Sequence, residues 1–329
     1  MKFSGFDATR IVIGALLVLA VSAPAKGETT IGKNTVVRFL SANESRPVIA
    51  ARDDFVKRLS PFDRAARLKV AQPVSEEQYL AFVGSNVRDW TEKETEQLCT
   101  IMAEFPPLLA GLPWPATIQL IKTTGAEEGN AAYTRGAAIF LPVADLARSS
   151  PELKRLLCHE LFHILSRRNP GLREKLYSVI GFTACDEVEL PPELAARKIT
   201  NPDAPRNDHL IRLQIDGQTR LALPVLLSSA ETYDVKRGGE FFNYLTFQFL
   251  VMEPTTTPRR FKVAQQNGSP RLVGIKAVTG FFEQVGRNTE YIIHPEEILA
   301  DNFALLVLGG EKIATPEILD KMKKVLFAK

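Results

Sequence analysis

Apolar residues dominate the chain between residues 151 and 168, where they recur at the spacing of an α-helix. The large ones are Leu156, Leu157, Leu161, Phe162, Ile164 and Leu165. Ser150 is expected to cap this helix, Pro151 suits its first position, and Glu152 favours its positively polarised end. The run Asn169-Pro170-Gly171 predicts its end. A helix so rich in Leu and Phe is expected to be buried, because a solvent-facing helix carries only one apolar stripe.

The rest of the pattern changes between helical and β periodicity and predicts an α+β protein. Further helices are expected at residues 91–109, at 171–180, from Pro295 to a stop at Gly309-Gly310, and at 315–328. Strands are expected at 117–122 and 131–141, as a hairpin of 210–215 and 219–227 around Asp216-Gly217, within the aromatic run 241–252, and as a hairpin of 261–264 and 272–277 around Asn267-Gly268. The later strands predict a β-rich insertion or subdomain over about residues 182–290.

The buried helix carries the most informative polar residues of the chain, in the run His159-Glu160-Leu161-Phe162-His163. Side chains at positions i and i+4 share one face of a helix, so both imidazoles can bind one metal ion. Glu160 lies about 100° around the helix from His159, where it can take a proton from a water on the metal without being a ligand. The chemistry predicted is zinc-dependent hydrolysis of a peptide or amide bond.

A catalytic zinc site normally has three protein ligands, and the third is expected from a second helix near the C-terminus. That helix begins after His294-Pro295 and carries Glu297 and Asp301 four residues apart, hence on one face. Glu297 can ligate the metal while Asp301 binds the outer nitrogen of a histidine ligand. Glu296 is the neighbouring alternative, but the position four residues after it is Ala300.

With these two helices the chain resembles the gluzincin superfamily of metallopeptidases. The resemblance implies a zincin-like fold, in which a small mixed sheet packs on the motif helix. It also implies that His159, His163 and Glu297 bind zinc, that Glu160 is the general base, and that Asp301 orients a ligand. The long separation of Glu297 from His163 departs from the compact members of the superfamily, and it implies an insertion or a divergent family.

Two further features of such enzymes have candidates here. In peptidases with this motif an extended substrate lies along an edge strand near the zinc, and the segment around Gly136 and Ala137 suits this role because small side chains allow close approach. An ordinary strand with a bulge at Gly136 is the alternative. The donor that stabilises the oxyanion is usually a Tyr or His, and the candidates nearest in sequence to Glu297 are Tyr291 and His294. Tyr244 and His209 are also possible.

The first 25 residues are typical of an export signal, with Lys2 and Arg10 before the apolar stretch 11–21 and small residues at 23–25. An uncleaved anchor is the alternative. Residues 26–329 would then form the catalytic domain in the periplasm or outside the cell, without stable membrane insertion. The net charge of +3 gives no support for nucleic-acid binding, so the expected partner is a peptide or protein substrate. Cys99 and Cys185 could pair in an oxidising compartment.

The sequence therefore predicts an exported zinc metallopeptidase in which Glu160 activates a water. Two alternatives stay open. One is a zinc amidase of another kind, such as a deformylase-like enzyme with a cysteine ligand, although Cys99 lacks the expected glycine-rich surroundings. The other is a catalytically silent envelope protein that uses the same fold for binding, although an intact Glu160 argues against lost activity.

Overall fold

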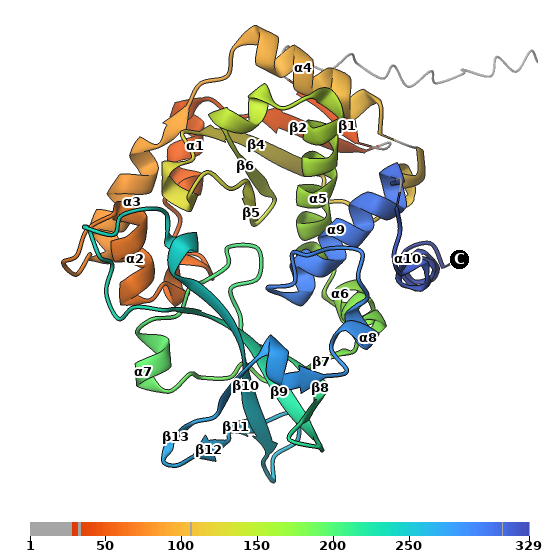
Figure 1. The fold of residues 1–329 in the computed structure, drawn as a ribbon. Coiled ribbons are helices and arrows are strands. Elements are labelled where there is room, and N and C mark those ends of the chain that lie inside the picture. Colours follow the sequence, from red (N-terminus) through yellow and green to blue (C-terminus); the bar gives the residue numbers. More distant parts are fainter. Residues whose placement is uncertain (1–27, 32–33, 106, 311, 329) are drawn as a thin grey trace, which may run out of the picture.

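The computed structural model describes residues 28–31, 34–105, 107–310 and 312–328. Within these ranges the chain forms an α+β structure with two large sheets (Figure 1), which confirms the predicted class. The predicted export signal, residues 1–25, lies outside the described residues. None of the helices within them is both long enough and apolar enough to cross a bilayer.

The first sheet is mixed and lies beside the motif helix. Its strands follow the order β1 (Glu28–Ile31), β2 (Thr35–Phe39), β4 (Thr117–Thr123), β6 (Ala138–Pro142) and β5 (Tyr133–Arg135), and β3 (Val87–Arg88) pairs with the end of β4. Strands β2, β4 and β6 are parallel, whereas β1 and β5 are antiparallel to their neighbours. The central strands are largely apolar because helices and loops cover both faces of parallel strands. Strand β5 is an edge of this sheet.

The strand predicted at residues 131–141 is in fact the hairpin of β5 and β6, and that prediction is wrong. Gly136 adopts a φ of +61° and turns the chain together with Ala137. Every residue of β5 and of β6 is buried, and for this reason the sequence of the hairpin resembles that of one continuous strand. Gly136 and Ala137 therefore lie in the turn, and the edge strand itself is Tyr133–Arg135.

The second sheet is antiparallel, and its strands all lie between Phe182 and Thr279. It follows the order β11 (Phe261–Val263), β10 (Leu245–Pro254), β9 (Gln218–Ser228), β8 (His209–Ile215) and β15 (Val278–Thr279), with β14 (Leu272–Gly274) paired to β10 and β7 (Phe182–Ala184) paired to β8. The β8–β9 hairpin turns at Asp216 and Gly217, with φ values of 50° and 72°, as predicted.

The second predicted hairpin is only partly right. The turn at Asn267-Gly268 exists, but it joins the short strands β12 (Gln265–Gln266) and β13 (Ser269–Pro270). The flanking strands β11 and β14 pair with β10 instead of with each other, because β10 is long enough to hold both along one side. The aromatic run is a strand only from Leu245 onward.

Ten α-helices lie within the described residues. They are α1 (Ala42–Ile49), α2 (Pro61–Leu68), α3 (Glu76–Ser85), α4 (Glu92–Ala103), α5 (Ser150–Arg168), α6 (Pro170–Val179), α7 (Pro192–Ala195), α8 (Phe282–Val285), α9 (Pro295–Leu308) and α10 (Pro316–Leu326). Helix α5 carries the motif and is capped by Ser149 rather than by Ser150, because Glu152 accepts the backbone N–H of Ser149 at 3.0 Å. Helix α9 begins after the cap His294 and ends at Leu308, with Gly309 as its C-cap, as predicted.

Helices α5 and α9 lie side by side between the two sheets (Figure 1). One continuous core contains buried side chains of both helices together with Leu120 of the first sheet and Leu213 of the second. The rings of Phe162 and Phe303 join the two helices, with centroids 5.4 Å apart. Because tight packing restricts movement, polar side chains on the facing sides of α5 and α9 are held at fixed separations.

Candidate metal centre

The facing sides of α5 and α9 bring the predicted ligands together. The Nε2 atoms of His159 and His163 lie 3.1 and 3.5 Å from the same oxygen, Oε2, of Glu297. The ligand atoms of all three residues lie within 4.8 Å of one another. His163 and Glu297 are buried, and the side chain of His159 is 12% exposed. Three donors from two rigid helices thus converge on one point beside a solvent-accessible surface.

A separate carboxylate binds the outer nitrogen of each histidine. Asp301 lies 3.1 Å from Nδ1 of His159, as the four-residue spacing from Glu297 predicted. Glu296 lies 3.2 Å from Nδ1 of His163. These bonds orient both rings so that the Nε2 atoms face Glu297, which is how ligating histidines are usually fixed.

Glu296 was considered from the sequence only as a rival ligand, but it lies behind His163. Its Oε2 accepts hydrogen bonds from the hydroxyls of Ser166, at 2.9 Å, and of Tyr177, at 2.5 Å. These donors and His163 hold the pKa of Glu296 below its ordinary value, although burial acts against them. Glu296 is therefore a fully bonded anion that positions His163.

The irregular segment before β8 contributes two side chains that sequence reasoning missed. Asn201 donates from Nδ2 to Oε1 of Glu297 at 2.6 Å, which leaves Oε2 for the histidines. Asp203 accepts from the backbone N–H and the hydroxyl of Thr134 at 2.8 and 2.6 Å. A carboxylate oxygen of Asp203 also lies within 4.8 Å of ligand atoms of Glu160 and His163. The only signal for these residues was a polar pair, Asn-Pro-Asp, in a proline-rich segment.

The carboxylates give the centre a strong preference for positive charge. Burial disfavours the charged form of His159, but hydrogen bonds with Asp301 and Glu297 outweigh it and raise its pKa to about 9. Burial acts likewise on His163, whose pKa the charges of Asp203 and Glu297 nevertheless raise well above its ordinary value. A divalent cation satisfies the same charge requirement as these protons.

Glu160 lies in the same cavity but makes none of these bonds. Burial, and then the charge of Asp203, raise its pKa above the ordinary value. Its Oε2 is buried and has no hydrogen-bond partner within the described part of the chain. A carboxyl group in this state can hold or release a proton near neutral pH, as a general base requires.

The cavity at the centre has a volume of about 390 Å³. Its lining includes Glu160, Tyr291 and the segment Asn130-Ala131-Ala132, which leads into the edge strand β5. The ring of Tyr291 lies 6.4 Å from that of His159, so this candidate donor is at the site. Gly136 and Ala137 are not among the lining residues.

The other three candidate donors lie elsewhere. His294 lines a neighbouring cavity, and its Nδ1 accepts the backbone N–H of Glu296 at the start of α9. The ring of His209 packs on Tyr177, with centroids 4.4 Å apart. Tyr244 is buried and donates to the carbonyl of Asp234 at 3.0 Å. Of the four candidates the structure brings only Tyr291 to the cavity of Glu160.

The donor set and its spacing fit a zinc ion. Donor atoms about 2.1 Å from one tetrahedral zinc stand about 3.4 Å apart, close to the two distances from Glu297 to the histidines. Two imidazoles and one carboxylate are also a usual ligand set of catalytic zinc. Cys99, Cys158 and Cys185 are free thiols, and none lines this cavity, so a site with a cysteine ligand has no support here.

No protein-family model matches the chain, and no similar protein was found among curated proteins or among solved structures.

Proposed function

We propose that this chain is a zinc-dependent metallopeptidase of the gluzincin type, with a zincin-like catalytic domain. One observation carries the proposal: Nε2 of His159 and Nε2 of His163 face the same oxygen of Glu297, while separate carboxylates hold both Nδ1 atoms. In an ordinary protein core, one hydrogen-bond partner for each ring nitrogen is enough for a histidine. Two such histidines do not need to direct their Nε2 atoms at one shared oxygen. The mixed sheet beside α5 and the β-rich segment between α6 and α9 agree with a zincin-like domain that carries an insertion.

His159, His163 and Glu297 would hold the zinc ion. When bound, zinc acts as a Lewis acid that lowers the pKa of water and polarises a carbonyl group. Asp301 and Glu296 keep the two imidazoles in the orientation and tautomer that ligation requires. Asn201 fixes Glu297 from the opposite side, so the third ligand has one free oxygen.

Glu160 moves the proton in the proposed reaction. Its unpartnered Oε2 takes a proton from the attacking water, and the raised pKa allows the carboxyl to retain it. The same oxygen then delivers the proton to the leaving nitrogen, which completes the cleavage of an amide bond. Because Glu160 is not a ligand in this arrangement, its removal separates catalysis from metal binding.

Strand β5 and the residues that lead into it are the proposed contact for the substrate backbone. Asn130, Ala131 and Ala132 line the cavity, and an edge strand can pair with an extended peptide. Tyr291 would donate its hydroxyl to the oxyanion. Partial burial and the charge of Glu297 raise the pKa of Tyr291 well above its ordinary value, so this hydroxyl stays a donor.

Export to the periplasm or the cell exterior is part of the proposal and rests on the pattern of residues 1–25. N-terminal sequencing of protein from the cell envelope should give a chain that starts near residue 26. An intact Met1 on membrane-bound protein would show the anchor alternative to be right.

Metal content is the direct test of the proposed function. Mass spectrometry of the purified mature protein should find one zinc per chain, and His163→Ala should remove it. Incubation with a mixture of peptides should give defined cleavage products that a chelator abolishes. A protein without bound zinc after reconstitution, or with zinc that His163→Ala leaves in place, would contradict the proposed centre.

A further inference from the structure

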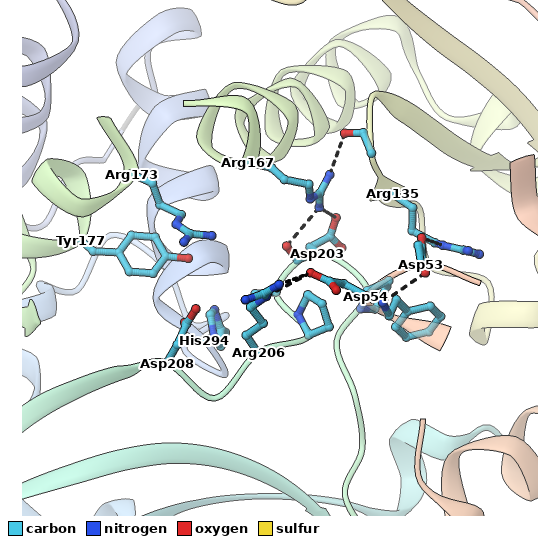
Figure 2. Close-up of a pocket in the computed structure, with 15 residues that line it drawn as sticks. Asp53, Asp54, Arg135, Arg167, Arg173, Tyr177, Asp203, Arg206, Asp208 and His294 are labelled. Carbon is cyan, nitrogen blue, oxygen red and sulfur yellow. Dashed lines mark hydrogen bonds and ion pairs between the residues drawn. The ribbon is translucent and has the colours of Figure 1, made fainter. Parts of the chain in front are cut away.

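A second cavity adjoins the metal centre, and four arginines and four aspartates are among the residues that line it (Figure 2). Its volume is about 280 Å³. Asp203 lines both cavities, so the two meet at one residue. Helix α5 contributes lining residues to both cavities: Glu160 lines the cavity at the metal centre, and Arg167 lines the second cavity. Two helical turns separate these residues, which is about 10 Å along the helix axis.

The arginines and aspartates of this second cavity are equal in number, but one arginine has no carboxylate in direct contact. Three of its four arginines are paired with carboxylates: Arg135 with Asp53 at 2.7 Å, Arg206 with Asp54 at 2.6 Å, and Arg167 with Asp203 at 3.7 Å. The fourth carboxylate, Asp208, binds Nδ1 of His209 at 2.6 Å. Arg173 on α6 is the remaining cation, and no carboxylate of the described residues lies within 4.0 Å of its guanidinium nitrogens.

Arg173 is held in place although it has no ion-pair partner. Its guanidinium carbon lies 5.9 Å from the ring centroid of Tyr177. Its Nε is buried and has no hydrogen-bond partner among the described residues. Figure 2 shows the guanidinium group directed into the cavity beside Tyr177. A half-buried guanidinium with unused donors is a strong binding group for an anion.

His294 adds a second unused donor to the same cavity. Its Nδ1 accepts the backbone N–H of Glu296 at 3.1 Å, so the proton of the neutral ring is on Nε2. Burial lowers the pKa of His294 to about 4 and keeps the ring neutral. Within the part of the chain that the structure describes, no residue accepts a hydrogen bond from Nε2. The cavity thus presents one cation and one neutral donor without partners.

We propose that the cavity lined by Arg173 and His294 binds a peptide carboxylate, through the guanidinium group of Arg173 and Nε2–H of His294. This inference rests on the proposed function and names its substrate class: peptides with a free C-terminal carboxylate. Because the two cavities meet at Asp203, a peptide whose carboxylate lies beside Arg173 and whose scissile bond lies at the metal centre would be cleaved near its C-terminus.

Binding to the Glu160→Gln protein loaded with zinc tests the inference without turnover. The probes are an acetylated tetra-alanine with a free C-terminus, its C-terminal amide, and an amidated analogue that ends in glutamate. Calorimetry should show the free acid binding about ten- to hundredfold more tightly than the alanine amide, the usual weight of a charge-assisted hydrogen bond. Tight binding of the glutamate amide as well would identify an acidic side chain as a second source of the carboxylate.

Arg173→Leu in that background should bring the acid and the amide to equal affinity, with zinc content unchanged. Arg173→Lys should keep part of the preference, because it retains the charge but not the fork of donors. Arg168→Leu is the matched control, since it removes an exposed charge from the end of α5 and should preserve the preference. His294→Ser keeps an oxygen to cap α9 and should weaken acid binding by a smaller factor.

Equal affinity for acid and amide in the unchanged cavity would overturn the inference, as would a preference that survives Arg173→Leu. These results are separable from failure of the proposed function. A protein that prefers the acid but cleaves no peptide retains the carboxylate site and loses the peptidase. A protein that cleaves acid and amide peptides equally, and binds them equally, retains the peptidase and loses the site.

Discussion

Two clusters of buried charge lie on either side of the segment Thr200–Asp203, and they differ in how their charges are matched. In the first, Arg67 pairs with Asp63 at 2.7 Å and with Glu128 at 2.5 Å, and its side chain is fully buried. We call these three residues the Arg67 cluster. In the second, the candidate metal centre, several carboxylates surround two imidazoles beside an open cavity.

The Arg67 cluster has its donors directed to specific acceptors. The guanidinium group also donates to the carbonyl of Thr200 at 3.2 Å and lies over the ring of Phe241 at 4.4 Å. Asp63 accepts the backbone N–H of Thr200 at 3.1 Å. This cluster fastens α2 to the segment that carries Asn201, so it has a structural role. Buried charged groups that have direct partners join parts of the fold, whereas a buried charged group without a direct partner beside a cavity indicates a binding site.

Replacement of Glu160 by Gln should give the largest effect on activity. Turnover of any peptide substrate should fall by a factor of about 10² to 10⁴, because the proposed general base is lost while the shape of the side chain is kept. Zinc content and unfolding temperature should stay close to those of the unmodified protein. Initial rates and mass spectrometry measure the two properties on the same preparation.

His163→Ala separates ligation from proton transfer at the same centre. This variant should lose zinc, and a chelator should then have no further effect on its stability. If Glu160→Gln instead retained full turnover with zinc bound, Glu160 would not be the base, whatever the ligands are.

Arg67→Leu should have the largest effect on stability. The variant leaves Asp63 and Glu128 without their buried partner, and breaking a buried ion pair costs about 3–5 kcal/mol. Urea unfolding followed by circular dichroism measures this loss. Per folded molecule, zinc content should be unchanged, because the cluster supplies no ligand. A variant of unchanged stability would contradict the structural role.

The pH dependence of that loss follows from Glu128. Burial raises the pKa of Glu128 to about 7, even though the charge of Arg67 lowers it. A raised carboxyl pKa stabilises the folded state below the unfolded value of about 4.3, and this contribution is lost as the pH rises through the folded pKa. Without Arg67 the pKa rises further, so Arg67→Leu should be more destabilised at about pH 8 than at about pH 5.

Glu296 and Asp301 should have moderate and comparable effects on metal affinity. Glu296→Gln and Asp301→Asn each remove the charge behind one histidine ligand, and such changes usually weaken metal binding by about 10- to 100-fold. Competition with a chromogenic chelator measures the affinity. Glu296→Gln in particular tests the role found in the structure, because a residue that merely caps α9 would leave zinc affinity unchanged.

Local sequence rules were sufficient to predict those residues of the candidate site that lie on the same face of one helix. His159, His163, Glu297 and Asp301 were predicted because four-residue spacing places side chains on one face regardless of the rest of the fold. The roles of Asn201 and Asp203 were not predictable, since they depend on where an irregular segment crosses the two helices. The position of Glu296 behind His163 was missed for the same reason: its partners Ser166 and Tyr177 come from α5 and α6.

The errors in the fold have a related origin. Alternation and small residues predicted one strand where the left-handed conformation of Gly136 produces two. The turn at Asn267-Gly268 was found, but the partners of β11 and β14 were not, because pairing is decided by the length of β10. From its closeness to Glu297 in sequence, His294 was predicted to lie at the candidate metal centre. A helix cap directs its ring into the neighbouring cavity instead.

Arg206→Gln should have the smallest effect and sharpens the comparison between buried and exposed charge. Arg206 contacts Asp54 at 2.6 Å, about as closely as Arg67 contacts its partners, but both side chains are about half exposed. Exposed ion pairs contribute about 0–1 kcal/mol, because water screens the charges and the ordered side chains lose entropy. Urea unfolding of Arg206→Gln and Arg67→Leu side by side should therefore give a small loss and a large one. Equal losses would show that the distance between charges, and not their burial, decides how strongly an arginine stabilises this fold.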